Sequence, residues 1–346
     1  MTTTTLPPEA SAQPAPGASR GGRRSMPRLA RYVLARIGSG VATLLAVSAL
    51  VFFGANLLPG NAAEVALGVR AGDPAALQAA MAAAGLDQPV VIRYWTWLTG
   101  LLHGDLGVSM VTHQPIAELM GSRLENTLVL TGCLLLLLIP VTLALGTWSA
   151  MRKDTIVDRI VGSTTMWFLS TPEFVVGTFL VLIFASWLRI LPSVSLLNPR
   201  LSALEQPNLL VLPVLAMLIV GAGQVTRLVR AQTIDVLQSD FVQMAVLRGV
   251  PTRTLIFRHV VPNSLGPSVQ VLGMALGSLI GGVVVIETVF NYPGVGTMLV
   301  QAVSTRDITT VASLSILTSA AYILGNLIAD LVAMALDPQL RRGGGF

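Results

Sequence analysis

Side chains able to carry out catalysis are few in this 346-residue chain, and their spacing matches no catalytic site. Its only lysine, Lys153, follows Arg152 and precedes Asp154. A phosphate-binding P-loop needs Gly-Lys directly before Ser or Thr, because that lysine and the backbone amides contact the nucleotide phosphates. The sequence therefore predicts a non-catalytic chain without a cofactor of its own, in which any ATP and Mg²⁺ are bound by partner subunits.

Metal chemistry is not indicated either. The three histidines, His103, His113 and His259, lack the spacing of metal ligands. The single cysteine, Cys133, lies in an apolar stretch, so neither a disulfide framework nor a thiolate metal site is available. We interpret His259 as a structural or docking residue.

Acidic residues within or beside long apolar stretches are the candidates for a transport pathway, because charge inside a membrane is costly and usually functional. Glu173 lies 14 residues after Arg159, roughly 21 Å along a helix, and directly follows Pro172, whose missing N–H opens a helix. Two interpretations of Glu173 stay open, a role in substrate specificity and pairing with a partner subunit. Glu287 and Asp330 lie near the ends of apolar stretches and are interpreted as structural or gating residues.

The composition is that of a membrane protein: 53% of the residues are hydrophobic and 11% are charged, about half the usual share of a soluble domain. Six stretches without Asp, Glu, Lys or Arg match or approach the roughly 20 residues that cross a bilayer as a helix. The sequence predicts an all-α polytopic protein with six transmembrane helices at about 37–58, 126–150, 160–188, 208–228, 264–287 and 310–336.

The orientation follows from the basic residues, most of which lie on the side that holds both termini. Basic residues favour the cytoplasmic side of a membrane, so both termini are predicted to be cytoplasmic. The net positive charge of +5 is explained by this topology, so the expected surroundings are membrane lipid and no nucleic-acid partner is expected.

Three segments flank the spans. Residues 1–25 are rich in Thr, Pro, Ala, Gly and Ser and are predicted to be a disordered cytoplasmic tail before the membrane domain 26–346. The first span is interpreted as a retained anchor, with signal cleavage after Ala62 or Ala63 as the alternative. The external loop 59–125 is long. Its acidic residues either attract cationic groups or reflect the usual shortage of basic residues outside.

This external loop has local structure of its own. Asp73 as N-cap, Pro74 at the first helical position and Gly85 past the end predict a short helix. The aromatic run that starts at Tyr94 is suited to the membrane interface.

The cytoplasmic segment 229–263 reads as two short helices broken at Gly249. Gly249 suits the C′ position, where positive φ is cheap, and Thr252 is expected to cap the second helix. The segment exposes apolar residues on a polar loop. It is therefore predicted to dock against a protein, or alternatively to lie on the lipid surface.

The run Asp240–Pro267 resembles the coupling loop of binding-protein-dependent importer permeases, with its Ala-x-x-x-Gly core and His-x-x-Pro-Asn ending. Gln243-Met244 stands where the general motif has Glu-Ala, and the basic residues typical of the peptide branch are reduced to Arg248. The resemblance implies contact with an ATPase by Asp240, Phe241, Ala245, Arg248, Gly249, Phe257, His259, Pro262 and Asn263.

Three further segments resemble the dipeptide and oligopeptide permease family: residues 94–98 with 104–109, residues 287–296, and residues 326–330 with 337–338. The resemblance covers about residues 31–342 and implies the fold of a type I importer permease in the bacterial inner membrane. It also implies three kinds of protein partner: a second homologous permease, two ATPase subunits or domains, and an external substrate-binding (lipo)protein. Family members carry dipeptides, oligopeptides, haem or nickel complexes.

Three glycines, Gly273, Gly277 and Gly281, are spaced by four along the fifth predicted span, either for close helix packing or to widen a pathway. With Glu173, Glu287, Asn326 and Asp330 they make up the predicted pathway and gating set.

The leading interpretation is one permease subunit of an ATP-driven peptide importer. The alternative is a stand-alone ion-coupled transporter or channel, which would predict inverted repeats and several buried charges.

Overall fold

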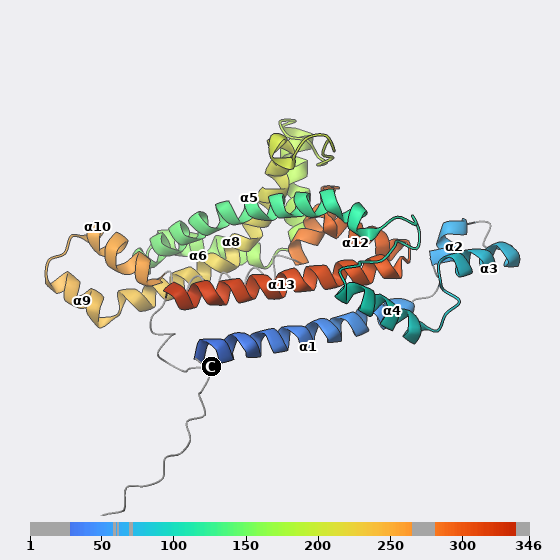
Figure 1. Ribbon diagram of the computed structural model, residues 1–346. Helices are drawn as coiled ribbons and strands as arrows, with labels where there is room; N and C mark the ends of the chain where they lie inside the picture. Colours follow the sequence, from blue (N-terminus) through green and yellow to red (C-terminus); the bar gives the residue numbers. More distant parts are fainter. Residues whose placement is uncertain (1–27, 58–59, 61, 69–71, 265–280, 337–346) are drawn as a thin grey trace, which may run out of the picture. The chain divides into compact units, whose positions relative to one another are not determined.

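The computed structural model describes residues 28–57, 60, 62–68, 72–264 and 281–336 (Figure 1). The predicted tail 1–25 and most of the predicted span 264–287 lie outside them. The chain divides into two compact units, residues 1–39 and 40–346. Of the first unit, the structure describes the N-terminal part of helix α1, and the packing described below is that of the second unit.

The described residues are helical apart from turns and one isolated antiparallel bridge between Val108 and Pro115. The helices are α1 (Arg28–Asn56), α2 (Ala62–Leu67), α3 (Pro74–Ala83), α4 (Val90–Leu102), α5 (Ile116–Met151), α6 (Ile156–Leu169), α7 (Glu173–Leu180), the π-helical η2 (Val181–Trp187), the 3-10 turn η3 (Ala203–Glu205), α8 (Pro207–Leu237), α9 (Asp240–Leu247), α10 (Thr252–Thr254), the π-helical η4 (Leu255–Val260), α12 (Val295–Ser304) and α13 (Ile308–Leu336). Residues 281–289 are also helical.

Four of the described helices are long and apolar enough to cross a membrane: Val33–Asn56 of α1, α5, α8 and Ile308–Val332 of α13. Helix α6 and the α7–η2 helix meet at 103° and count as a fifth if together they form one broken span. The predicted all-α polytopic class is confirmed, and the number of six spans remains a prediction.

The third predicted span, 160–188, is bent rather than straight. The break falls at residues 170–172, where Pro172 takes the N-cap position of α7. Proline donates no backbone hydrogen bond, and it disfavours helical geometry in the residue before it. Glu173 therefore stands at the first position of a new helix.

Two other helices extend past their predicted spans. Helix α5 begins ten residues before position 126, and α8 continues nine residues beyond position 228. Charge-free length sets the membrane-crossing part of a helix, but polar residues such as Arg123 and Arg230 continue the same helix outside the apolar stretch. The first nine residues of the predicted cytoplasmic segment 229–263 accordingly belong to α8.

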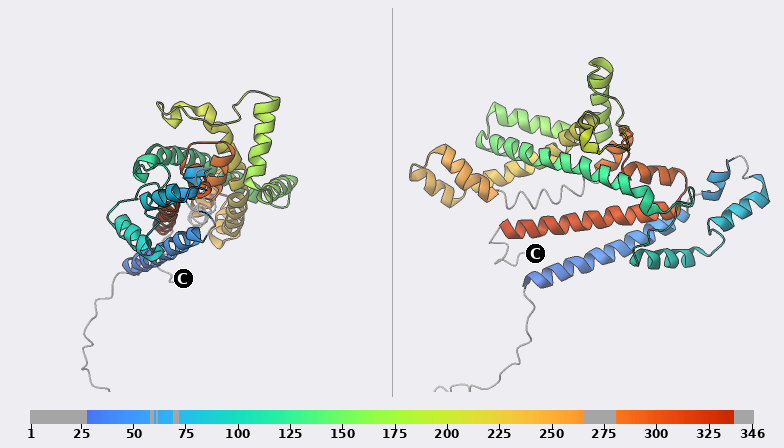
Figure 2. Two further views of the ribbon diagram at one scale, coloured as in Figure 1. Left: turned by 90° about the vertical axis from the view of Figure 1, so that its right-hand side faces the viewer. Right: turned by 45° about the horizontal axis from the view of Figure 1, so that its top comes forward.

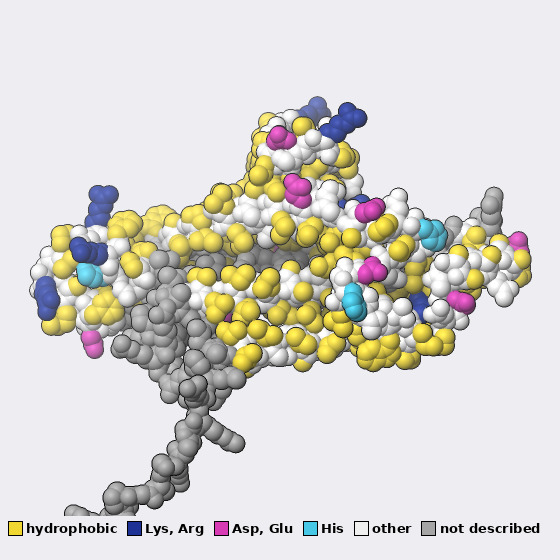
Figure 3. Space-filling view, viewed as in Figure 1, with side chains coloured by type: hydrophobic (Ala, Val, Ile, Leu, Met, Phe, Trp, Pro, Cys, Tyr) yellow, Lys and Arg dark blue, Asp and Glu magenta, His cyan; other side chains and the backbone are white. Residues whose placement is uncertain are grey.

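Helix α8 is the centre of the packing and contacts α5, α6 and α7 (Figures 1 and 2). Half of its most apolar 18-residue window is buried, against 22% for α5. The main cluster joins Leu130, Leu134 and Leu138 of α5 with α8 residues such as Met217 and with Phe290. Side chains of α5 that face away from this cluster are exposed, and in Figure 3 hydrophobic side chains cover the long helices. Such surfaces need lipid or another subunit to cover them.

The external-loop helix forms as predicted. Asp73 is the N-cap of α3 and its carboxylate accepts a hydrogen bond from the Ala75 N–H at 3.0 Å. Pro74 is the first helical residue, and Gly85 adopts a φ of +66° just past the end.

The aromatic run is helix α4, and its sides differ. Tyr94 and Trp97 share one face and are buried against Phe52 of α1 and Ile308 of α13, whereas Trp95 is 58% exposed. Only part of the predicted interfacial patch is therefore free to face a membrane.

Candidate functional site

The segment predicted to couple to an ATPase is a helical hairpin, α9 to η4 (residues 240–260), which we call the coupling hairpin. Helix α9 ends at Leu247 with Arg248 as its C-cap, and Gly249 follows with a φ of +73°, as the sequence predicts. The Val250 N–H donates to the Ala245 carbonyl at 3.2 Å, which closes the turn. The second helix starts at Thr252, with Pro251 as N-cap, so the prediction that Thr252 caps it is wrong by one position. Pro251 has a ψ of 140°, the extended geometry that an N-cap adopts.

An apolar interior holds the two arms of the hairpin together. Val242, Leu255 and Val260 are buried, and Ala245 packs against them with Val236 and Leu237 of α8. Ala245, one of the predicted docking residues, thus packs inside the hairpin. The arms cannot separate without exposing this cluster, so the hairpin and the end of α8 form one packed unit.

The outward face of the hairpin is apolar and unpartnered within the described part of this chain. Leu247 is 80% exposed, Phe257 68% and Phe241 48%, with Met244 beside them. Asp240 and Arg248 are exposed at the two ends of α9, and basic side chains lie around this end of the helices (Figure 3). Large apolar side chains clustered within a polar rim are typical of a surface that binds another protein or a membrane.

The end of the coupling segment is more local. The Asn263 side-chain amide donates to the His259 carbonyl at 2.6 Å, one helical turn back. Pro262 and Asn263 are exposed and His259 is half-buried. The predicted docking residues Asp240, Phe241, Arg248, Phe257, Pro262 and Asn263 therefore all reach the surface.

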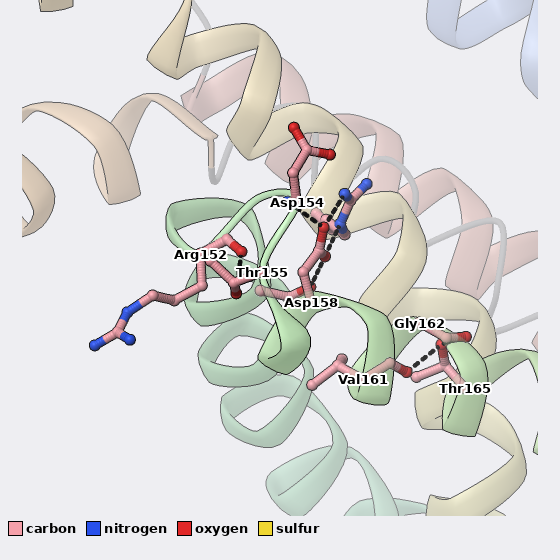
Figure 4. Close-up of polar contacts among 9 residues, drawn as sticks. Arg152, Asp154, Thr155, Asp158, Val161, Gly162 and Thr165 are labelled. Carbon is pink, nitrogen blue, oxygen red and sulfur yellow. Dashed lines mark hydrogen bonds and ion pairs between the residues drawn. The ribbon is translucent and has the colours of Figure 1, made fainter.

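An ion pair that the sequence did not predict lies on α8, about two helical turns before that helix ends. The Arg230 guanidinium of α8 donates to both carboxylate oxygens of Asp158 on α6, through Nε at 2.6 Å and Nη2 at 2.7 Å (Figure 4). Ser149 Oγ of α5 donates to the same carboxylate at 2.6 Å, and the Asp154 N–H does so at 3.0 Å. The only signal in the sequence is that two acidic residues, Asp154 and Asp158, stand among the basic residues of the segment 152–159.

Glu287 lies at the opposite end of the bundle, in a turn formed by residues 287–297 that we call the Glu287 turn. Its side chain is completely buried. Its carboxylate accepts hydrogen bonds from Thr127 Oγ1 at 2.6 Å and from the N–H groups of Gly296 and Thr297 at 2.7 and 3.2 Å. An anionic group at the first N–H groups of a helix is favourable, so Glu287 caps α12.

Hydrogen bonds to α5 hold the same turn in place. The Tyr292 hydroxyl donates to the Asn126 carbonyl at 2.7 Å, and the Asn126 side-chain amide donates to the Pro293 carbonyl at 2.9 Å. Gly296 has no room for a side chain, since a Cβ there would lie 2.6 Å from the Val284 Cα. The motif of residues 287–296 is thus a packed structural turn in this chain.

The motif of residues 104–109 is anchored in a comparable way, by an acid that sequence reasoning missed. Asp307 is buried and accepts hydrogen bonds from Ser109 Oγ at 2.5 Å and from the Met110 N–H at 3.2 Å. The Leu106 carbonyl accepts from Ser313 Oγ at 2.7 Å, and this hydroxyl in turn accepts from Trp97 Nε1 at 2.9 Å. Both motifs therefore bind their segment to the helices.

The predicted pathway residues are not brought together into one cluster. Gly273 and Gly277 lie outside the described residues. Gly281 has open space where a Cβ would stand, so at this position the glycine does not serve close packing within the described chain. Asn326 and Asp330 lie half-buried on α13.

Glu173 meets a glycine that the sequence prediction did not single out. Its half-buried carboxylate contacts Gly282, and a Cβ on Gly282 would overlap with it. No hydrogen bond or ion pair to this carboxylate is found within the described part of the chain, unlike the carboxylate of Glu287. Glu173 thus remains available to a group outside this chain.

The described residues hold no cluster of three or more His, Cys, Asp or Glu side chains that would bind a metal ion. The lone Cys133 packs at the edge of the main apolar cluster.

Comparison with known proteins agrees with this architecture over nearly the whole chain. Residues 142–342 match the family described as the inner membrane component of binding-protein-dependent transport systems, and residues 29–145 match its N-terminal family. A glutathione transport system permease protein, GsiC, of Pectobacterium atrosepticum is 34% identical over 310 residues, covering 90% of this chain and 98% of the relative.

Two other relatives are similar to the same extent. GsiC of Salmonella typhimurium is 33% identical over 310 residues, with 90% and 98% of the two chains covered. A probable D,D-dipeptide transport system permease protein, DdpB, of Escherichia coli is 32% identical over 326 residues, covering 88% of this chain and 96% of the relative. The chain thus belongs to the membrane permease components of binding-protein-dependent transport systems, in the peptide-importer branch of the ATP-binding-cassette family.

Proposed function

We propose that this chain is one of the two permease subunits of an ATP-driven importer for short peptides, with both termini in the cytoplasm. The coupling hairpin carries the proposal: a rigid extension of the central helix α8 presents Phe241, Leu247 and Phe257 to the outside. A surface of this kind suits a cytoplasmic ATPase that changes shape. The chain itself contains no P-loop, so the ATP is hydrolysed on that partner.

The other partners follow from the family and from the exposed helix faces. Helix α5 keeps many apolar side chains exposed, such as Leu128 and Leu136, which suits lipid or a second, homologous permease. An external binding protein would deliver the substrate, and alternating access would arise because that protein and ATP favour different conformations of the permease pair.

The substrate class is inferred from relatives. Their names specify glutathione and D,D-dipeptides, and the shared class is a short peptide. Glu173 supports this choice: within the bent third span it supplies a carboxylate that has no partner among the described residues and is complementary to a peptide ammonium group. Pairing of Glu173 with the second permease is the competing role.

Reconstitution of the complete complex in proteoliposomes tests the proposal. With its ATPases, second permease and binding protein, the chain is expected to accumulate a labelled dipeptide only when ATP is present on the cytoplasmic side. Ligand identification on the co-purified binding protein distinguishes peptides from haem and nickel complexes. Substrate flux by the purified chain alone, without an ATPase, would contradict the proposal and favour a stand-alone transporter.

A further inference from the structure

The Asp158–Arg230 pair stands out because it joins three separate elements at one carboxylate. Arg230 comes from α8, Ser149 from α5, and Asp158 from the start of α6, with the Asp154 N–H from the turn between α5 and α6 (Figure 4). The Asp158 side chain is 8% exposed and that of Arg230 is 30% exposed.

This geometry is unlike that of a loose surface ion pair. The two nitrogens of one guanidinium edge contact the two oxygens of one carboxylate, the arrangement that gives arginine pairs both strength and a fixed orientation. Exposed pairs contribute little because water competes and two flexible side chains must be ordered. Here Asp158 is shielded, and four hydrogen bonds satisfy it.

Backbone packing beside the pair already brings the same helices close together. A Cβ on Gly146 of α5 would lie 2.7 Å from Val229 Cγ1 of α8, one residue before Arg230. A Cβ on Gly223 of α8 would lie 2.9 Å from the Thr165 carbonyl oxygen of α6. Helices α5, α6 and α8 therefore meet at two close contacts and one ion pair.

The position of the pair connects this packing to the coupling hairpin. Arg230 lies seven residues before the end of α8, roughly 10 Å along its axis. Helix α9 begins at Asp240, and Val236 and Leu237 of α8 pack into the interior of the hairpin. A displacement of the hairpin thus acts on the end of α8, about two helical turns beyond the pair.

We propose that Asp158 and Arg230 are positioning residues for energy coupling, which clamp α8 to the α5–α6 turn so that motion of the coupling hairpin moves three helices as one body. The inference rests on the proposed function, because it assigns the pair a task in ATP-driven transport. It is not a gate: the pair stays closed throughout the transport cycle.

The first test measures peptide uptake and ATP hydrolysis by the same reconstituted complex. Asp158→Asn is expected to lower the amount of peptide taken up per ATP hydrolysed by about tenfold, the size of a typical coupling effect, with the complex still assembled. Arg230→Lys keeps the charge but loses the two-point contact. Its peptide uptake per ATP hydrolysed is expected to lie between that of the wild type and that of Asp158→Asn. The exchange Asp158→Arg with Arg230→Asp is expected to recover part of the loss.

Matched controls come from the same elements. Arg152→Gln removes an exposed charged side chain from the same α5–α6 turn, and Arg227→Gln removes an exposed arginine one turn earlier on α8. Both are expected to leave the uptake-to-ATP ratio unchanged. An unchanged ratio in Asp158→Asn would overturn the proposal, and so would a loss of uptake that only follows a loss of assembled complex.

The second test asks whether the contact must open. Cysteines replace Asp158 and Arg230 in a Cys133→Ala background, which removes the only native cysteine, and a short bifunctional thiol reagent joins them. The joined complex is expected to regain coupled uptake relative to the unjoined one. If joining stops transport, the pair is a gate and the proposal is overturned. If the wild-type complex shows no ATP-driven peptide uptake at all, the proposed function fails rather than the clamp.

Discussion

The Glu287 turn and the coupling hairpin both carry motifs of the permease family, but the motif residues are mostly buried in the turn and largely exposed in the hairpin. In the Glu287 turn the motif residues bind one another and α5, and the buried carboxylate is fully hydrogen-bonded. In the coupling hairpin the motif residues Phe241 and Phe257 point away from the chain. The motif of the Glu287 turn therefore stabilises this subunit, whereas the outward residues of the hairpin motif have no contact that covers them within the described chain.

This contrast separates two kinds of functional residue. Changes in the Glu287 turn should act on the stability of the subunit by itself, and changes on the outside of the hairpin should act only in the assembled complex. Each of the following variants tests one side of that division, with stability measured on the purified subunit in detergent.

The largest effect is expected for Glu287→Ala. The change leaves the Thr127 hydroxyl and the N–H groups of Gly296 and Thr297 without their acceptor in a buried site, which costs about 3 kcal/mol or more of unfolding free energy. Thermal unfolding of the purified subunit measures it. Glu287→Gln keeps one acceptor oxygen, so its unfolding temperature should lie between those of the wild type and Glu287→Ala. Glu125→Gln, at an exposed acid of α5, is the control and should change little.

The second-largest effect on stability is expected for Gly296→Ala. Its unfolding free energy should fall by about 2 kcal/mol, because the added methyl group overlaps with the backbone of Val284. The matched control is Gly281→Ala, where the site is open. Equal unfolding temperatures for the two variants would contradict the packing of this turn.

Gly249→Val tests the hairpin side of the comparison. A β-branched residue at a φ of +73° is strained by about 1–2 kcal/mol, so the turn must change its path. The global unfolding temperature should shift less than in the two variants above, because the strain is local to the hairpin. ATP-dependent uptake should nevertheless fall strongly. Normal uptake by a fully assembled complex would contradict the coupling role.

Local features of the chain were predictable from the sequence, and long-range ones were not. Asp73 and Gly249 were predicted because a cap or a turn depends on neighbours a few residues away. Arg230 lies 72 residues from Asp158 and Ser109 lies 198 residues from Asp307, so no local pattern marks these two contacts. The bend at Pro172 was foreseen as a weak point, but its angle of 103° depends on how α7 packs against α8.

The exposed face of the coupling hairpin should give the smallest change in the isolated subunit. Phe257→Ser removes an aromatic side chain that is 68% exposed, so the unfolding free energy of the subunit should change by no more than about 0.5 kcal/mol. Aromatic residues often dominate protein interfaces, so binding of the ATPase should weaken by about tenfold or more. Titration of the ATPase against the reconstituted permease pair measures it.

The control for Phe257→Ser is Trp95→Ser, at an aromatic residue of similar exposure on α4, in the loop that we predict to be external. It should leave ATPase binding unchanged. If Phe257→Ser weakened attachment of the hairpin to lipid vesicles but not to the ATPase, the hairpin would be an interfacial membrane helix instead. The two motif-bearing regions would then differ only in what covers them, lipid on one side and the chain's own helices on the other, and the ATPase would have to contact a different surface.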